Sequence, residues 1–249
     1  RNVGTTTNWG TETSLQVIPI STDNIEWALG VTYSTNDSKV TDLGPLDNLG
    51  GSIRVGYPLF MRYGDRIANP GVLGALPGKE KAYLGHLYPT TLLGLHTRLT
   101  LSRSLTLDLL GEGQYGMLRH IGPAHQNTRR SQWPLCYAIQ DVWANGDRST
   151  LTSSQVGQCV GSKTDSDYWT NKADFFKLRS ASLSYRLPDG LVPGASSAQL
   201  TIQGKNLLTY KGDYVGIDPE ANDRRRSSPF EYYNSAPPRV FLINVTINF

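Results

Sequence analysis

The chain has 249 residues, of which 38% are apolar, and its mean hydropathy is −0.36. No stretch approaches the roughly 18 apolar residues that a membrane-spanning helix needs, so no such helix is predicted. The formal net charge of +3 is scattered, with Arg224 to Arg226 as the one basic run, which disfavours nucleic acid as a partner.

Low hydropathy does not by itself exclude a membrane protein built from strands. The chain holds 13 Tyr, five Trp and 25 Gly in a sequence that alternates between apolar and polar residues. A barrel with lipid outside and water inside hides its membrane character from hydropathy in this way. A water-soluble β-protein therefore stays open beside a membrane barrel. Arg1 opens the chain without an initiator Met or a signal peptide, which predicts a cut or processed start.

Alternation with a period of two recurs along the chain in segments of about ten residues. In Ile25 to Ser34 one face is Ile, Trp, Leu, Val and Tyr, and the other is Glu, Ala, Gly, Thr and Ser. The pattern returns at Leu93 to Ser102 and at Leu105 to Tyr115, which predicts a hairpin around Ser102 to Ser104. Further strands are predicted at 180–187, 199–205 and 241–249, with Leu110 and Asn206 breaking the parity.

Short links interleave with long ones between these strands. The short links are 21–24, 102–104 and 188–197, and the long ones include 119–173 and 211–236. Outer-membrane barrels have short periplasmic turns and long external loops, whereas a compact soluble domain seldom carries a loop of 55 residues. The link lengths thus favour an antiparallel transmembrane β-barrel segment.

Because each strand crosses from one side of the membrane to the other, the alternation of short and long links also gives a strand count. If Phe249 ends in the periplasm, a strand climbs through Phe60 to Ile67 and Pro70 to Tyr88 is external. The turn at Ser21 to Asn24 then requires one further descending strand, for which Gly50 to Gly56 is the candidate. We therefore expect eight to nine strands.

Several stretches carry a family resemblance. They are DFFKLRSASLSYRLP at 174–188, AQLTIQGKNLLTYKGDYVGIDPE at 198–220 and PRVFLINVTINF at 238–249, preceded by WGTETSLQVIPI, WALGVTYSTNDSKVTDL, RVGYPLF and YLGHLYPTTLLGL between residues 9 and 95. In order and spacing they resemble the C-terminal strands of the SusC/RagA family of TonB-linked outer-membrane transporters. The resemblance covers most of the chain apart from the 119–173 loop.

The resemblance implies a function for the whole chain. Residues 1–249 would be the C-terminal part of a barrel of about 22 strands in the bacterial outer membrane, without its plug and N-terminal strands. Such importers take up oligosaccharides or peptides, are capped by a SusD-like surface lipoprotein and receive energy from TonB. The family also implies that Phe249 is read by the barrel-assembly machinery as a terminal aromatic signal. No enzyme activity or cofactor is expected.

The cysteines are an even pair. Cys136 and Cys159 lie 23 residues apart in a polar segment of the 119–173 loop, which suits an oxidising compartment. They are the candidate disulfide of the chain, with two free thiols as the alternative.

Aromatic side chains with polar neighbours crowd the expected external loops. Such rings suit the stacking of sugars at the mouth of an importer, whereas loop packing or a membrane-interface belt is the alternative. The residues concerned are Trp133, Tyr137, Trp143, Tyr168, Trp169, Tyr210, Tyr214, Tyr232 and Tyr233.

Catalytic and metal motifs are not expected. The four histidines, His86, His96, His120 and His125, lie near no GxSxG or HExxH pattern. Asp141, Asp147, Asp165 and Asp167 lack the ordered spacing of a calcium loop. Two rival functions stay open: a self-contained small barrel acting as an adhesin or membrane enzyme, and a secreted carbohydrate-binding β-sandwich.

Overall fold

The computed structural model describes residues 4–50, 53–221, 230–232 and 234–249. Arg224 to Arg226 and Tyr233 lie outside these ranges.

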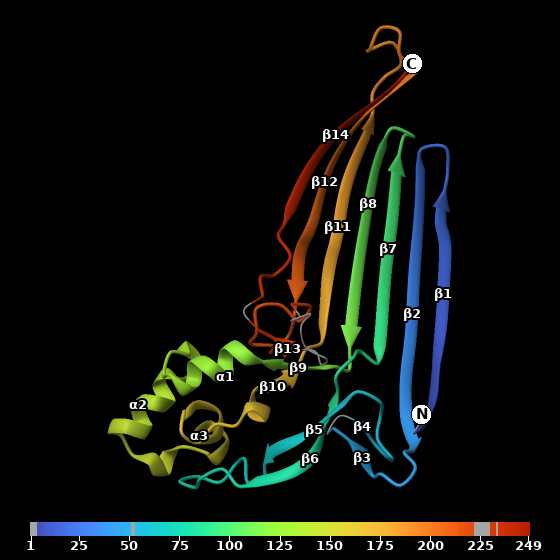
Figure 1. Ribbon diagram of the computed structural model, residues 1–249. Helices are drawn as coiled ribbons and strands as arrows, with labels where there is room; N and C mark the ends of the chain where they lie inside the picture. Colours follow the sequence, from blue (N-terminus) through green and yellow to red (C-terminus); the bar gives the residue numbers. More distant parts are fainter. Residues whose placement is uncertain (1–3, 51–52, 222–229, 233) are drawn as a thin grey trace.

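A single antiparallel sheet, here called the wall, forms the body of the molecule (Figure 1). In Figure 1 it is a tall, curved layer, and the two chain termini lie at opposite ends of it. Within the described residues, its outer strands each pair on one side alone. In spatial order the wall strands are β1 (Thr5–Ser21), β2 (Ile25–Asp42), β7 (Thr91–Leu101), β8 (Leu105–Tyr115), β11 (Phe175–Arg186), β12 (Ser197–Tyr210) and β14 (Val240–Asn248).

Short links close one end of the wall, the turn end, and long links emerge from the other, the loop end (Figure 1). The expected hairpin between β7 and β8 is confirmed, because Leu101 pairs with Leu105. Ser102 and Arg103 both have positive φ, at 48° and 55°. Two such residues make the type I′ turn, whose twist matches that of the flanking strands.

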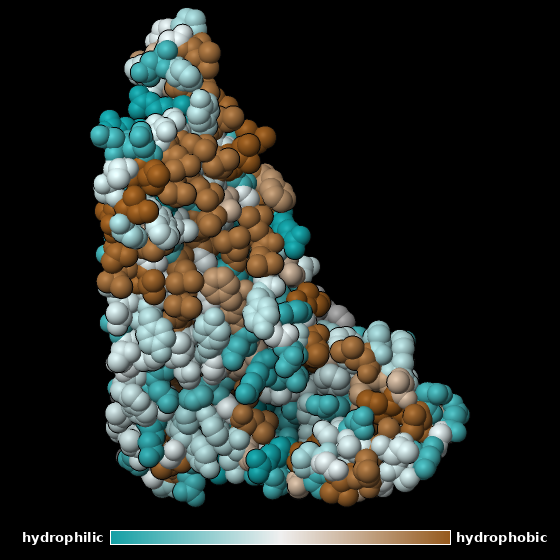
Figure 2. Space-filling model, turned by 180° about the vertical axis from the view of Figure 1, so that it is seen from behind, coloured by the Kyte–Doolittle hydropathy of each residue, from teal (hydrophilic) through white to brown (hydrophobic). Residues whose placement is uncertain are grey.

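The register sorts the side chains of the wall onto two faces, as alternation predicts. One row across six strands is entirely apolar: Ile25, Leu101, Leu105, Tyr185, Leu200 and Val245. The next row is entirely polar: Glu26, Thr100, Thr106, Ser184, Thr201 and Asn244. The apolar face forms a broad band toward the turn end of the wall (Figure 2).

The long link between β2 and β7 does not supply the two wall strands that the sequence predicts there. The described part of the expected 50–56 strand contains β4 (Ile53–Arg54), which pairs with β3 (Asn48–Leu49) instead of joining the wall. The expected 60–67 strand is β5 (Met61–Ile67), and it pairs with β6 (Lys79–His86) in a separate hairpin. Because β2 pairs directly with β7, the wall has seven strands among the described residues.

The link between β8 and β11 folds into a compact unit, the loop-end subdomain (residues 117–173). Its elements are β9 (Leu118–Ile121), α1 (Gly122–Arg129), η1 (Pro134–Cys136), α2 (Tyr137–Asn145), η2 (Arg148–Thr150), α3 (Ser153–Cys159), η3 (Ser166–Trp169) and β10 (Thr170–Lys172). β9 pairs with β10 and with β13 (Phe230–Glu231). None of the helices in the described ranges has the length and apolar character needed to cross a membrane.

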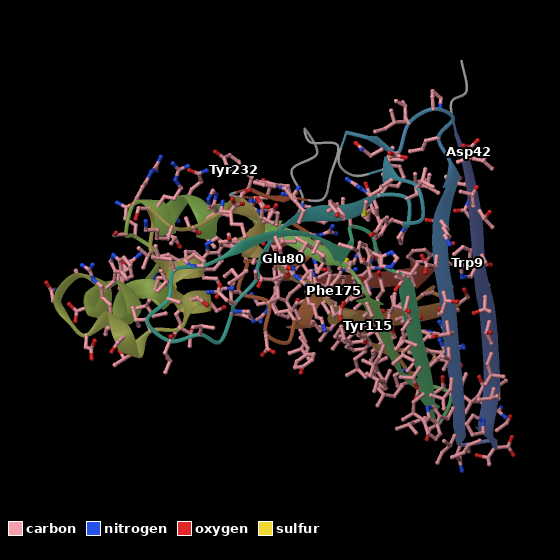
Figure 3. All side chains as sticks on the ribbon, turned by 90° about the horizontal axis from the view of Figure 1, so that it is seen from below. Trp9, Asp42, Glu80, Tyr115, Phe175 and Tyr232 are labelled. Atoms are coloured by element: carbon pink, nitrogen blue, oxygen red, sulfur yellow. A yellow bond between two sulfur atoms is a disulfide. The ribbon has the colours of Figure 1, made fainter. Side chains whose placement is uncertain are left out.

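The main core lies where this subdomain meets the wall. Its fully buried members include Met117, Ile121 and Phe175, which come from the link between β8 and β9, from β9 and from the start of β11. Phe175 occupies the centre of the view in Figure 3, between the wall strands and the helices. Among the described residues, no helix or second sheet covers the wall over most of its height, so most of its side chains stay half-buried or exposed.

Candidate functional site: the two faces of the wall and its loop end

The apolar face is bounded toward the loop end by a row rich in aromatic rings. The register aligns Tyr33, Leu93, Gly113, Phe176 and Tyr210 across five strands. A Cβ on Gly113 would meet the ring of Tyr115, so this ring covers the glycine position. Beyond this row the same face carries Thr35 and Thr91, so the apolar band ends here. Tyr side chains collect at membrane–water interfaces because one end is apolar and the other polar.

Toward the turn end the apolar face is strongly exposed. On β14 the exposed fractions of Phe241, Ile243 and Val245 are 72%, 75% and 58%. Large apolar side chains at this exposure, in a contiguous band, mark a surface that contacts a membrane or another protein.

The opposite face carries a cluster of ionisable side chains on β7 and β8. Asp108 Oδ2 accepts a hydrogen bond from Arg98 Nε at 3.0 Å and lies 3.1 Å from His96 Nε2. Thr100 and Thr106 contact each other one row further toward the turn end. Leu110, which breaks the alternation, lies on this polar face and is 42% exposed. This face is suited to contact water or a polar partner.

A buried ionic network joins the wall to the segment that follows β12. Lys177 Nζ donates to both carboxylate oxygens of Asp218, at 2.7 and 2.8 Å, and to Glu220 at 2.5 Å. Arg179 bridges Glu220 and Glu112. Burial alone would raise the pKa of Glu220, but hydrogen bonds from Arg179 and Lys177 outweigh it and hold that pKa below its usual range. The network fixes residues 211–221 against the wall.

Arg119 ties three segments together through hydrogen bonds to backbone carbonyls. Its Nε donates to the carbonyl of Pro219 at 2.8 Å and its Nη1 to the carbonyl of Leu87 at 3.2 Å. Burial lowers the pKa of this guanidinium. Nearby, the fully buried Glu231 accepts hydrogen bonds from the Tyr214 hydroxyl and the Ile217 amide. Burial and the adjacent Glu231 both raise the pKa of Tyr214, so its phenol stays protonated.

Three carboxylates from the β5–β6 hairpin and η3 come together. Asp65, Asp165 and Asp167 place oxygens within 4.8 Å of one another. Each has a cationic partner, in Lys81, Lys79 and Arg62 respectively. The other two aspartates considered from the sequence are elsewhere: Asp141 accepts from Asn145, and Asp147 caps η2. The cluster therefore works as a charge-balanced tie between the hairpin and the subdomain.

Cysteines 136 and 159 are joined by a disulfide in the structure, with a Cα–Cα distance of 5.0 Å. The bond connects the end of η1, directly before α2, to the end of α3, inside the main core. Formation of this bond in the cell envelope stays a prediction.

The loop aromatics divide by burial. Tyr168, Trp169 and Tyr214 are 6%, 5% and 3% exposed, so they pack the core and present no face to a ligand. Trp133 packs edge-on against Trp169, and Trp143 lies under the guanidinium of Arg148. The exposed members in the described ranges are Tyr137 at 51%, Tyr210 at 69% and Tyr232 at 41%. Tyr210 belongs to the row that bounds the apolar band.

The histidines lie in different surroundings, with His120 and His125 close together. His120 is 7% exposed and stacks on Phe230, with ring centroids 4.3 Å apart. Burial, reinforced by the Arg62 charge and by His125, lowers the pKa of His120 to about 4, so this ring is neutral at pH 7. His96 lies on the polar face, as expected, and His86 lies near Asp37.

Sequence reasoning did not find the long-range partners at the loop end. Lys177 and Asp218 are 41 residues apart, and Arg119 and Pro219 are 100 apart. One feature of the sequence points to a buried charge at this place: Lys177 directly follows the two phenylalanines that begin β11.

Comparison with known proteins finds relatives of one kind, TonB-dependent receptors. No family model matches the chain. It is 21% identical to the TonB-dependent receptor P26 of Formosa agariphila and 23% identical to the TonB-dependent receptor P3 of the same organism. Both alignments cover all of this chain, which spans 30% and 29% of those receptors.

Solved structures show the same fold. The RagAB peptide importer in its closed-closed state matches with a TM-score of 0.77, and in its open-open state with 0.75, each at 17% identity. All of this chain is covered, and it spans 30% and 29% of those chains. The resemblance drawn from the sequence is confirmed: over its full length, this chain is similar in sequence to about 30% of two TonB-dependent receptors and in fold to about 30% of the matching RagAB chain.

Proposed function

We propose that residues 1–249 supply the C-terminal part of the barrel wall, and several external loops, of a TonB-dependent outer-membrane nutrient importer. One observation carries the proposal. The described part of the chain has a seven-stranded sheet with one apolar and one polar face, and the whole chain aligns with a receptor and an importer of which it spans about 30%. An arc of a larger barrel needs these two faces, because it contacts lipid outside and water or protein inside.

The open edges of the wall support the same proposal. β1 and β14 each expose a row of backbone N–H and C=O groups to no partner in the described part of the chain. In lipid each unpaired group costs several kcal/mol, so further strands must continue the sheet on both sides. The seven strands belong, in this proposal, to a barrel of about 22 strands.

The proposed orientation places the turn end in the periplasm and the loop end outside the cell. The loop end carries the helical subdomain and the β5–β6 hairpin, which suits contact with substrate and with a SusD-like surface lipoprotein, by likeness to the RagAB importers. TonB would drive the transport. Phe249 follows β14 and is 86% exposed, which suits its proposed recognition by the barrel-assembly machinery.

The proposed cargo is an oligosaccharide or a peptide, and the proposed role is transport without catalysis. The relatives are receptors and importers. No GxSxG or HExxH motif occurs in the sequence.

Topology labelling in intact cells tests the proposal. Tyr137→Cys at the loop end and Asp189→Cys at the turn end both replace well-exposed residues. In the full-length receptor, a membrane-impermeant maleimide should label Tyr137→Cys in intact cells and Asp189→Cys only after the outer membrane is permeabilised. Unmodified receptor is the control for the native cysteines. Equal labelling of both variants, or recovery of the protein in the soluble fraction, would contradict the proposal.

A further inference from the structure

A pocket of about 340 Å³ opens at the loop end, where β2 passes the segments before β5 and before β7. It is lined by Asn8, Asn36, Asp37, Ser38, Leu59, Phe60, His86, Tyr88, Pro89 and Thr90. Asn36 and Ser38 alternate with Thr32 and Ser34, so they belong to the polar face of β2. On β1 the pocket is lined by Asn8. The next residue, Trp9, is labelled in Figure 3 and pairs with Asp37.

We propose that this pocket binds one ring of a neutral saccharide. Phe60 and Tyr88 meet edge to face, with ring centroids 5.6 Å apart and an interplanar angle of 77°. They are 45% and 49% exposed, so ring surface stays open to a ligand. The apolar C–H face of a sugar can stack on such a ring while its hydroxyls reach polar neighbours.

The strained backbone of Phe60 holds its ring in place. Its φ is +58°, a conformation that bulky side chains rarely adopt. Two hydrogen bonds fix the segment: Leu87 N donates to Phe60 O, and Leu59 N donates to Ser38 Oγ, both at 3.0 Å. Strain that the surroundings maintain is typical of binding sites, because it positions a group before the ligand arrives.

Hydrogen-bonding groups in the pocket are available for hydroxyls. Within the described residues, the side-chain amides of Asn8 and Asn36 make no hydrogen bond. Asp37 Oδ1 accepts from Ser38 N at 2.6 Å, and its Oδ2 has no partner in the same ranges. Asp37 is the acidic lining residue and His86 the basic one, and neither Lys nor Arg lines the pocket. A neutral sugar therefore fits better than a sulfated or acidic one.

Within the described residues, β2 offers a peptide main chain no continuous free edge at the pocket. On the pocket side of β2, Asn36 N already donates to Thr90 O, and Val40 exchanges hydrogen bonds with Gly56 and Tyr57. The other side of β2 is paired with β1. An extended peptide usually adds itself to an open sheet edge, so this site favours a ligand recognised by stacking and side-chain hydrogen bonds.

The inference rests on the proposed function, and direct binding to the purified full-length receptor tests it. The probes are neutral hexose tetrasaccharides of several linkages, and short neutral peptides, measured by calorimetry. Phe60→Gly, which tolerates the positive φ, and Tyr88→Ala should each weaken saccharide binding about tenfold. Leu73→Ala, which alters another exposed residue of the same 43–90 link and lies outside the pocket lining, should bind the saccharide normally.

Heat-modifiable gel mobility confirms that each variant is folded, and Asn8→Ala replaces Phe60→Gly if the latter is not. Saccharide binding that these substitutions leave unchanged, or binding of no saccharide at millimolar concentration, overturns the inference. If the substitutions abolish peptide binding and not saccharide binding, the pocket binds peptides, and this result also overturns the inference. A receptor that passes the topology test but binds no sugar leaves the proposed function standing. Failure of the topology test removes that function whatever the pocket binds.

Discussion

Thr97 lies on the apolar face between Leu95 and Leu99. A hydrogen bond from the neighbouring strand satisfies its hydroxyl there. The indole Nε1 of Trp27 donates to Thr97 Oγ1 at 2.9 Å. A polar group in an apolar environment costs free energy unless it is hydrogen-bonded. The strand therefore keeps its regular alternation of faces at Thr97, although a polar residue stands there on the apolar face.

A matched pair of substitutions tests the assignment of the two faces. Leu107 pairs with Leu99 and Leu183 on the apolar face, while its neighbour Thr106 pairs with Thr100 and Ser184 on the polar face. In the full-length receptor, Leu107→Arg should lower the free energy of unfolding by about 2 to 4 kcal/mol and Thr106→Arg by much less. Urea titration in bilayers measures both. Equal losses would mean that neither face contacts lipid.

A residue-scale pH effect follows from His120. Its pKa is about 4 in the folded chain and 6.5 when unperturbed. Between these values the unfolded state binds more protons, so stability falls as the pH drops from 6.5 toward 4. Replacing the ring by His120→Phe should remove up to about 3 kcal/mol of this fall. Unfolding of the loop-end subdomain, followed by tryptophan fluorescence at several pH values, measures it. An unchanged difference between pH 7 and pH 4 would contradict the assignment.

At the scale of elements, a bulge sets the position of the ionic network. The pairing of β11 with β12 and with β8 shifts register between Leu178 and Ser180. Asn206, which like Leu110 breaks the apolar–polar alternation of the sequence, has φ +54° and donates to Pro238 O. Bulges re-aim side chains and change the strand direction. Here the shift frees Arg179 to bridge Glu112 and Glu220.

Removing one member of this network should release the 211–221 segment. The side chains of Lys177 and Asp218 are 3% and 6% exposed. Lys177→Met leaves Asp218 buried without its cation and should cost about 3 to 5 kcal/mol, whereas Lys177→Met with Asp218→Leu should recover much of the loss. Hydrogen exchange of residues 211–221 reports the release. Lys205→Met, at an exposed lysine on β12, is the control, and equal exchange in both variants would refute the role.

The disulfide is the second element-scale prediction. Cys136 and Cys159 close a loop of 23 residues, for which the chain-entropy model gives about 3 kcal/mol of stabilisation. The double variant Cys136→Ser with Cys159→Ser should therefore make the loop-end subdomain more sensitive to protease, with the wall unaffected. Thiol counting under denaturing conditions checks the bond directly. Two free thiols in receptor isolated from the envelope would rule it out.

At the scale of the whole molecule, seven strands with two open edges do not make a closed barrel. Residues 1–249 alone should aggregate, exchange strands or present an open sheet, because both edges expose unpaired backbone groups. Refolding in detergent, followed by heat-modifiable gel mobility and pore conductance beside the full-length receptor, tests this. A compact, heat-modifiable monomer from the fragment would favour the small closed barrel in place of the large one.

The sequence by itself determined the wall. Alternation with a period of two acts locally through the strand geometry, so it located Ile25 to Ser34, the β7–β8 hairpin and the final strand, and it assigned their faces. It also placed the two cysteines in one loop segment.

Only the tertiary structure decided what the long links do. Counting strands through the links places 60–67 in the wall, but β5 pairs with β6, because local periodicity does not encode pairing partners. Likewise, the burial of Tyr168, Trp169 and Tyr214 and the contact of Lys177 with Asp218 join residues far apart in the sequence. Such contacts depend on where the folded wall brings its loops together, which no local pattern specifies.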